Sequence, residues 1–140
     1  MIQLIYASTA KNPFTSEQLV ELLKKSREKN QRLNITGMLL YFDKSFIQVL
    51  EGEAAAVDGL YETITKDERH VNISLIFRRE IPAREFPEWE MGFMELTDDD
   101  IANVPGYSEI LKQHTLNSSY WSDHPSYAKA FLEAFMENLR

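Results

Sequence analysis

Residues 35–52 read ITGMLLYF (35–42), DKS (43–45) and FIQVLEG (46–52), two apolar runs joined by a short polar turn. This pattern predicts a β-hairpin whose strands are buried on at least one face. Side chains alternate between the faces of a strand, so Gln48 shares a face with Phe46 and Leu50. Burying an amide without partners costs about 1–3 kcal/mol. Gln48 therefore faces solvent, bonds to backbone, or meets a polar ligand, and only the third option would give the protein a function.

The segments around this hairpin predict an α+β fold. Thr15 and Gln18 have the spacing of a capping box at a helix start, and the acidic run at 98–100 opens a different region. The order βαββαββ predicts a ferredoxin-like sheet with two helices on one face and C-terminal helices on the other. We therefore expect two parts, residues 1–96 and a helical extension over 97–140. The expected elements besides the hairpin are strands over 2–6, 71–79 and 89–96, and helices over 15–28, 53–70, 105–114 and 123–135.

Composition limits the classes of function. The chain has 140 residues, no Cys and a net charge of −7, with no basic cluster larger than a pair. These features fit one domain with its own core and argue against nucleic-acid binding, which needs a basic surface. No apolar run reaches the roughly 20 residues of a membrane helix and no signal peptide is apparent, so we expect a cytoplasmic protein. The three His are far apart in sequence, so no metal site is expected.

Several polar residues are candidates for one site. The first and third strands of a ferredoxin-like sheet are neighbours, so Tyr6 and Gln48 can form a hydrogen bond on the helix-covered face. Taken alone, Tyr6 at the end of its strand is more simply a core tyrosine. Asn30 at the end of the first helix is equally a left-handed C-cap. Asp67 and Arg69 at the end of the second helix are equally a solvated ion pair, and Trp89 and Met91 are more often core.

Five short motifs nevertheless occur together in a fixed order: YAS (6–8), NQRLNITGMLL (30–40), FIQVLEG (46–52), DERH (67–70) and WEM (89–91). As a set they resemble the BLUF family, the blue-light sensors using flavin. The resemblance covers residues 1–96, and the remaining tail is similar to that of short, single-domain members.

The resemblance implies a flavin ring between the two helices, with FAD as the expected cofactor and FMN or riboflavin as alternatives. Tyr6 would donate an electron and a proton to the photoexcited flavin, and Gln48 would bridge Tyr6 and the ring. A rearranged hydrogen-bond network, with no new covalent bond, would then shift the absorption to the red. The other implied residues are Ser26, Lys29, Asn30, Asp67 and Arg69 around the flavin, and Trp89 and Met91 as the relay of the signal.

The resemblance also implies how the signal leaves the domain. We expect a photosensor without an output enzyme of its own, which acts on a separate signalling protein and forms a homo-oligomer. Three rivals remain on the same fold: an acylphosphatase-like hydrolase, a ligand-free interaction module and a flavin redox enzyme. The hydrolase would need an anion-binding loop with an Arg after the first strand, and residues 7–14 contain neither Arg nor Gly. A visible absorption spectrum separates the hydrolase and the interaction module from the photoreceptor.

Overall fold

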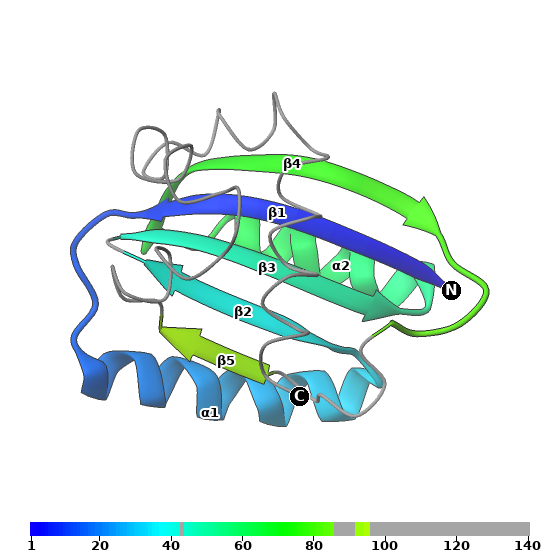
Figure 1. Cartoon of the computed structure of the whole chain (residues 1–140), viewed down its shortest axis with the longest axis horizontal. Coiled ribbons are helices and arrows are strands. Elements are labelled where there is room, and N and C mark those ends of the chain that lie inside the picture. Colours follow the sequence, from blue (N-terminus) through cyan, green and yellow to red (C-terminus); the bar gives the residue numbers. More distant parts are fainter. Residues whose placement is uncertain (43, 86–91, 96–140) are drawn as a thin grey trace, which may run out of the picture.

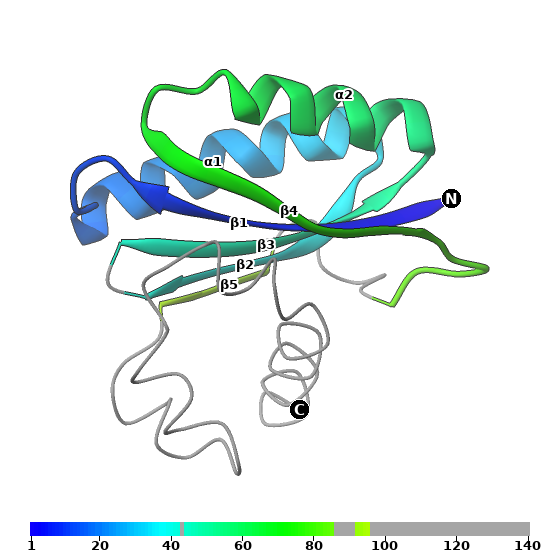
Figure 2. The ribbon, with the colours of Figure 1, turned by 90° about the horizontal axis from the view of Figure 1, so that it is seen from above.

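The computed structural model describes residues 1–42, 44–85 and 92–95, which form a five-stranded sheet and two helices. The strand order is β4-β1-β3-β2-β5. Both helices lie on the same face of the sheet (Figure 1 and Figure 2). The predicted ferredoxin-like βαββαββ order is confirmed, and the predicted helices beyond residue 97 lie outside the described residues. The elements are β1 (Ile2–Ala10), α1 (Ser16–Leu33), β2 (Thr36–Phe42), β3 (Ser45–Gly52), α2 (Ala54–Thr65), β4 (His70–Glu80) and β5 (Gly92–Glu95).

The sheet places the predicted pair of polar residues side by side. β1 and β3 are antiparallel, and Tyr6 lies directly opposite Gln48. On the other side of β3, Gln48 lies opposite Leu39 of β2. Directly opposed residues on antiparallel strands point to the same face and interact. Tyr6 and Gln48 therefore share the helix-covered face at the centre of the sheet.

The helix-covered face holds the main hydrophobic core. Alternate residues of the central strands face α1 and α2, as the strand periodicity predicts. The opposite face of these strands is buried as well, because Ile5, Met38 and Val49 are at most 2% exposed. Neither helix in the described part of the chain is long and apolar enough to cross a membrane. The helix-side core includes Ile2, Leu4, Leu19, Leu23, Leu39, Leu50, Val57 and Leu60.

The observed start of α1 matches the start predicted from the sequence, but its observed end does not match the predicted end. Thr15 and Gln18 form the predicted capping box through reciprocal side-chain to backbone hydrogen bonds. The helix continues to Leu33, and its left-handed C-cap is Asn34 at φ 55° and ψ 41°. The expected end near Glu28 and the reading of Asn30 as a C-cap are therefore wrong. Asn30 lies inside the last turns of the helix, so its side chain is available for another purpose.

Other predicted boundaries also shift. β1 runs to Ala10, so Tyr6 lies mid-strand, and α2 ends at Thr65, before Asp67. β4 does not keep the simple alternation expected for residues 71–79. Its pairing with β1 slips between Ile5 and Tyr6 and again between Ala7 and Thr9, and Leu75 is 44% exposed whereas Ile76 is buried. An irregularity of this kind adds a residue to one strand and reverses the facing of the side chains beyond it.

Gly37 is the glycine on which the sheet depends most. It lies opposite Leu50 in the β2–β3 pair, and a Cβ atom there would overlap the backbone carbonyl of Val49. Because backbone cannot move aside as a side-chain end can, we expect Gly37→Ala to destabilise the protein by about 3 kcal/mol or more. Urea unfolding followed by circular dichroism measures this change.

Gly59 in α2 is the matched control. A Cβ atom at Gly59 meets no atom of the described residues within 4 Å. Alanine is favoured over glycine inside a helix by about 0.5–1 kcal/mol, so Gly59→Ala should stabilise the protein. Equal effects of the two substitutions would contradict the close approach of β2 and β3.

Candidate functional site

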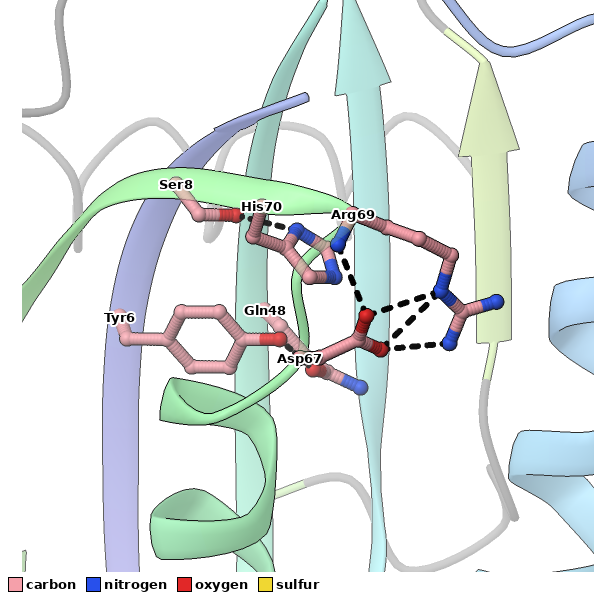
Figure 3. A network of polar contacts seen from close by, with 6 residues as sticks. All are labelled: Tyr6, Ser8, Gln48, Asp67, Arg69 and His70. Atoms are coloured by element: carbon pink, nitrogen blue, oxygen red, sulfur yellow. Dashed lines mark hydrogen bonds and ion pairs between the residues drawn. The ribbon is translucent and has the colours of Figure 1, made fainter. Parts of the chain in front are cut away.

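A tyrosine–glutamine pair forms the floor of the candidate site. The Tyr6 hydroxyl donates a hydrogen bond to Oε1 of Gln48, and the two side chains point toward each other from β1 and β3 (Figure 3). Tyr6 is 2% exposed and Gln48 is 6% exposed. Of the three alternatives for Gln48, exposure to solvent is therefore excluded. The amide is buried and has a side-chain partner on the neighbouring strand.

The surroundings keep the Tyr6 hydroxyl protonated. Burial raises the pKa of Tyr6 well above its usual value of about 10, and the nearby Tyr61 and Asp67 raise it further. The Tyr61 ring lies 5.5 Å from the Tyr6 ring, centroid to centroid. A neutral hydroxyl can donate to Gln48, whereas a tyrosinate could not. Tyr6 therefore holds its proton in the ground state and directs it at the amide oxygen.

The pair lies in a cavity of about 170 Å³ between the two helices. We call it the inner cavity. The sheet supplies its floor and the helices its walls, as ligand pockets commonly combine apolar walls with a few convergent polar groups. Its lining residues are Tyr6, Leu39, Phe46 and Gln48 of the sheet, Leu22, Lys25, Ser26, Lys29 and Asn30 of α1, Leu60 and Ile64 of α2, and Asp67, Arg69 and His70.

Asn30 provides the clearest sign that the inner cavity receives a ligand. The residue is 2% exposed, and its side-chain Nδ2 is buried without a hydrogen-bond partner among the residues that the structure describes. Leaving a buried amide donor unsatisfied costs about 1–3 kcal/mol, so such groups usually have a role. Ser26 and Lys29 are half-buried on the same helix and line the same cavity. A planar ligand with an acceptor on its edge would satisfy the free Nδ2.

The turn after α2 closes one end of the inner cavity with an ion pair. The Arg69 guanidinium donates to both carboxylate oxygens of Asp67, with the shortest contact at 2.6 Å, and the Arg69 backbone N–H donates to the same carboxylate at 2.9 Å. These hydrogen bonds from Arg69 lower the pKa of Asp67 to about 2. The carboxylate is thus ionised at neutral pH, and it is near enough to the Tyr6 hydroxyl to raise the pKa of that group.

His70 extends this polar group toward β1. Its Nδ1 lies 3.0 Å from the Ser8 hydroxyl, and its ring packs edge-on against Phe46 at 5.2 Å. Burial lowers the pKa of His70, although the neighbouring Asp67 opposes this effect. A largely neutral imidazole therefore lies beside the tyrosine strand, with its orientation set by Ser8 and Phe46.

A second, larger cavity of about 410 Å³ adjoins the first. We call it the outer cavity. Three residues, Leu22, Lys25 and Arg69, line both cavities. The remaining lining residues come from the β1–α1 loop, the start of α1 and the end of the turn before β4: Lys11, Asn12, Pro13, Phe14, Gln18, Glu21 and Glu68.

The structure brings together every predicted site residue that it describes. Tyr6, Ser26, Lys29, Asn30, Gln48, Asp67 and Arg69 all line the inner cavity. Trp89 and Met91 lie outside the described residues. Sequence reasoning missed Ser8 and His70, although Ser8 shares a strand face with Tyr6 and His70 directly follows Arg69. It also missed Lys25, which is one helical turn before Lys29.

Comparison with known proteins agrees with this geometry. The family model "BLUF: Sensors of blue-light using FAD" matches residues 1–92. A photoactivated adenylate cyclase subunit beta of Euglena longa is 32% identical over 111 residues, covering 79% of this chain and 13% of the relative. A blue light- and temperature-regulated antirepressor of Escherichia coli is 31% identical, covering 66% of this chain and 23% of the relative. The chain thus spans only a small part of the length of these relatives.

Solved structures show the same similarity. BlrB, a BLUF protein in its dark state, aligns with a TM-score of 0.70 and 29% identity, covering 92% of this chain and 96% of that chain. A bacterial light-regulated adenylyl cyclase aligns with a TM-score of 0.73 and 36% identity, covering 81% of this chain and 33% of that chain. The family match places the chain in the class of sensory domains, and its fold is the one those domains share. The chain belongs to the BLUF family, whose members sense blue light with FAD.

Proposed function

We propose that the Tyr6–Gln48 pair is the light-responsive element of this domain and that the flavin ring binds in the inner cavity. The observation that carries the proposal is the buried hydrogen bond from Tyr6 to Gln48 at the floor of that cavity. Perturbed titrating groups in a cavity are typical of functional sites, and Tyr6 and Asp67 are both perturbed. Fold alone would not support this role, because one fold carries many functions.

The polar residues of the inner cavity fit the donor and acceptor pattern of a flavin. Asn30 would donate from Nδ2, which has no partner in the described part of the chain, to a carbonyl on the pyrimidine-like edge of the ring. Lys29 and Ser26, from the same helix, would line that edge and the tyrosine side. Asp67 and Arg69 would contact the ring edge or the side chain of the flavin. Leu60 and Ile64 supply an apolar wall for the ring.

Light-driven transfer would start from Tyr6. When bound, a flavin would supply absorption of blue light and an acceptor for one electron and one proton. The neutral Tyr6 hydroxyl is a protonated donor on the floor of the inner cavity, and its proton points at Oε1 of Gln48. Both the electron and the proton would return to Tyr6, so the side chains would end in their original redox state. Only the hydrogen bonds differ.

Gln48 can change its hydrogen bonds after illumination because its side-chain amide has an acceptor oxygen at one end and a donor nitrogen at the other. Rotation or tautomerisation exchanges a donor for an acceptor at nearly the same position. A changed donor pattern toward the ring carbonyl lowers the excitation energy and shifts absorption to the red. One hydrogen bond is worth about 1 kcal/mol net, and a population shift between nearby states needs an energy difference of this size or a few times larger.

The signal would leave the domain toward a partner. BLUF relatives include photoactivated cyclases and an antirepressor, so the family acts with effector domains or proteins. We propose that this chain likewise signals to a separate protein rather than through an enzyme of its own, and that it does so as a homo-oligomer. Trp89 and Met91 are the proposed relay, with residues 1–96 as sensor and 97–140 as the contact region.

The test is spectroscopic. Purified protein mixed with FAD should acquire oxidised-flavin absorption, and blue light should shift that absorption to the red reversibly in the dark. A protein that cannot be loaded with flavin, or whose loaded form shows no shift, would refute the proposal.

An Asn30 variant adds a check on the location of the ring. Asn30→Ala removes one hydrogen bond to the ligand, so we expect FAD to bind about tenfold more weakly. Gln31→Ala, at the exposed neighbouring position, is the control and should leave binding unchanged. Equal affinities of wild type and Asn30→Ala would place the ring elsewhere.

A further inference from the structure

One arginine side chain, that of Arg84, joins the ends of α1, β2 and β3. Its Nη2 donates a hydrogen bond to the carbonyl oxygen of Asn34, the cap of α1, at 2.6 Å. Its Nη1 donates to the hydroxyl of Thr36, the first residue of β2, and to the carbonyl oxygen of Glu51 near the end of β3, both at 2.8 Å. A single planar cation therefore connects one helix with the two strands that form the central hairpin.

The bond to α1 leads directly to the backbone of Asn30. The carbonyl oxygen of Asn34 and the N–H of Ile35 belong to the same peptide unit. The oxygen accepts from Arg84, and the N–H donates to the Asn30 carbonyl oxygen at 2.9 Å. Arginine side chains near a helix C-terminus bind its last carbonyl groups, where the helix dipole favours a cation. One peptide unit thus lies between the guanidinium of Arg84 and the backbone of Asn30.

The bond to β3 fixes the strand that carries Gln48. Gln48 lies three residues before Glu51, and β3 is paired along its length with β1 on one side and β2 on the other. A strand held on both sides is stiff, so the position of its end and the position of Gln48 are coupled. Because Asn30 and Gln48 line the inner cavity from α1 and β3, the contacts of Arg84 bear on the spacing across that cavity.

The backbone beside Arg84 is itself firmly held. The N–H of Glu85 donates to the Glu51 carboxylate at 3.1 Å, and the Glu85 carboxylate accepts from the Gln3 amide at 2.9 Å and pairs with Arg79. Arg79 also donates to the Gln3 amide oxygen at 2.9 Å. The chain at Arg84 is thus attached to β1, β3 and β4, so the guanidinium can hold the end of α1 in place instead of moving with it.

We infer that Arg84 is a positioning residue for the flavin, which keeps Asn30 and Gln48 at the spacing that the ring needs. This role rests on the proposed placement of the ring in the inner cavity. Arg84 is not among the residues that line that cavity, so its effect reaches the ligand through the ends of α1 and β3. Binding groups that are already in place lose less freedom when a ligand binds, which raises affinity without any new contact.

A double-mutant cycle of FAD binding, measured by fluorescence titration of apoprotein, tests this role. Arg84→Met keeps an unbranched apolar stem and removes every donor, so it should weaken FAD binding about fivefold. In Asn30→Ala protein the side chain that Arg84 positions is gone, so adding Arg84→Met should weaken binding less than about twofold further. A general loosening of the fold would instead give the same loss in both backgrounds.

Two more arginine variants complete the cycle. Arg84→Lys keeps the charge but cannot reach three acceptors at once, so it should weaken FAD binding only about twofold. If Arg84→Met does not fold, Arg84→Lys takes its place in the cycle. Arg78→Met is the matched control, because Arg78 makes two hydrogen bonds of 2.9 Å to Asp58 of α2 and contacts neither α1 nor β3 through them. It should leave FAD affinity unchanged.

Amide hydrogen exchange of the apoprotein tests the link without a ligand. Loss of the guanidinium should loosen the peptide unit between Asn34 and Ile35, so the Ile35 N–H should exchange about tenfold faster in Arg84→Met. The Leu19 N–H, bonded to the Thr15 carbonyl oxygen at the other end of α1, should exchange at its wild-type rate. Equal acceleration at Leu19 and Ile35 would mean that Arg84 stabilises the helix as a whole.

The positioning role would be overturned by an equal loss of FAD affinity with and without Asn30, or by an unchanged exchange rate at Ile35. Both results would leave the placement of the ring standing, because that placement depends on the effect of Asn30→Ala alone. Wild-type affinity in Asn30→Ala protein would overturn the placement of the ring and the role of Arg84 together.

Discussion

Tyr6→Phe protein loaded with FAD should show no reversible red shift under blue light. Phenylalanine keeps the ring, its burial and its contact with Tyr61, and it removes the hydroxyl that donates to Gln48. The loss should be complete, because phenylalanine offers neither a transferable proton nor an easily removed electron. FAD should still bind, since the apolar lining of the inner cavity is unchanged. Light-minus-dark absorption spectra measure the shift, and fluorescence titration measures the binding.

A second buried tyrosine provides the control for this experiment. Tyr41 faces the same helix-side core from β2, and its hydroxyl accepts a hydrogen bond from the Phe14 backbone, but it does not line the inner cavity. Tyr41→Phe should keep the red shift. A normal shift in Tyr6→Phe, or its loss in both variants, would rule out Tyr6 as the specific donor.

Gln48→Leu should also abolish the normal red shift while FAD binding persists. Leucine is close in size and suits an apolar strand between Phe46 and Leu50, so the core should tolerate it. It has no donor or acceptor to rearrange, and the Tyr6 hydroxyl loses its acceptor. Light can still excite a bound flavin, but no amide remains to hold an altered pattern. If Gln48→Leu gave the same light-minus-dark difference spectrum as wild type, a group other than Gln48 would be responsible for the red shift.

Unfolding of the same variants tests the pair independently of light. Each single substitution leaves one buried polar group without the partner it has in wild type, at a cost of about 1–3 kcal/mol. The double variant Tyr6→Phe/Gln48→Leu removes both groups, so its destabilisation should be clearly less than the sum of the two. Urea unfolding of the apoprotein measures all four proteins. Additive effects would mean that the Tyr6–Gln48 bond contributes little.

The sequence predicted the pairing of Tyr6 and Gln48 because strand order follows from the order of elements. Once βαββαββ is recognised, the first and third strands are neighbours, and periodicity decides which residues share a face. Helix and strand ends were less predictable. Asn30 was the expected cap of α1, but the helix ends at Asn34, which adopts the left-handed conformation and donates its backbone N–H to the carbonyl oxygens of Asn30 and Gln31. The side chain of Asn30 is thereby left facing the cavity.

Long-range polar contacts were beyond sequence reasoning. Glu51 is fully buried, and its carboxylate accepts from the Gln3 amide at 2.9 Å and the Glu85 backbone at 3.1 Å. His70 meets Ser8, 62 positions away, in the same manner. No local sequence pattern predicts these pairs, because each pair depends on how segments far apart in the sequence are brought together in the fold.

The sequence by itself determined the order of the elements, the face of each central strand and the family motifs, because periodicity and motif spacing are local properties of the chain. Only the tertiary structure decided that Asn30 keeps a buried donor with no partner in the described ranges, that Asp67 is ionised near Tyr6, and that a second cavity adjoins the tyrosine–glutamine floor. Burial, electrostatic shifts and cavities arise where separate elements meet, and the distances between those elements exist only in the folded chain.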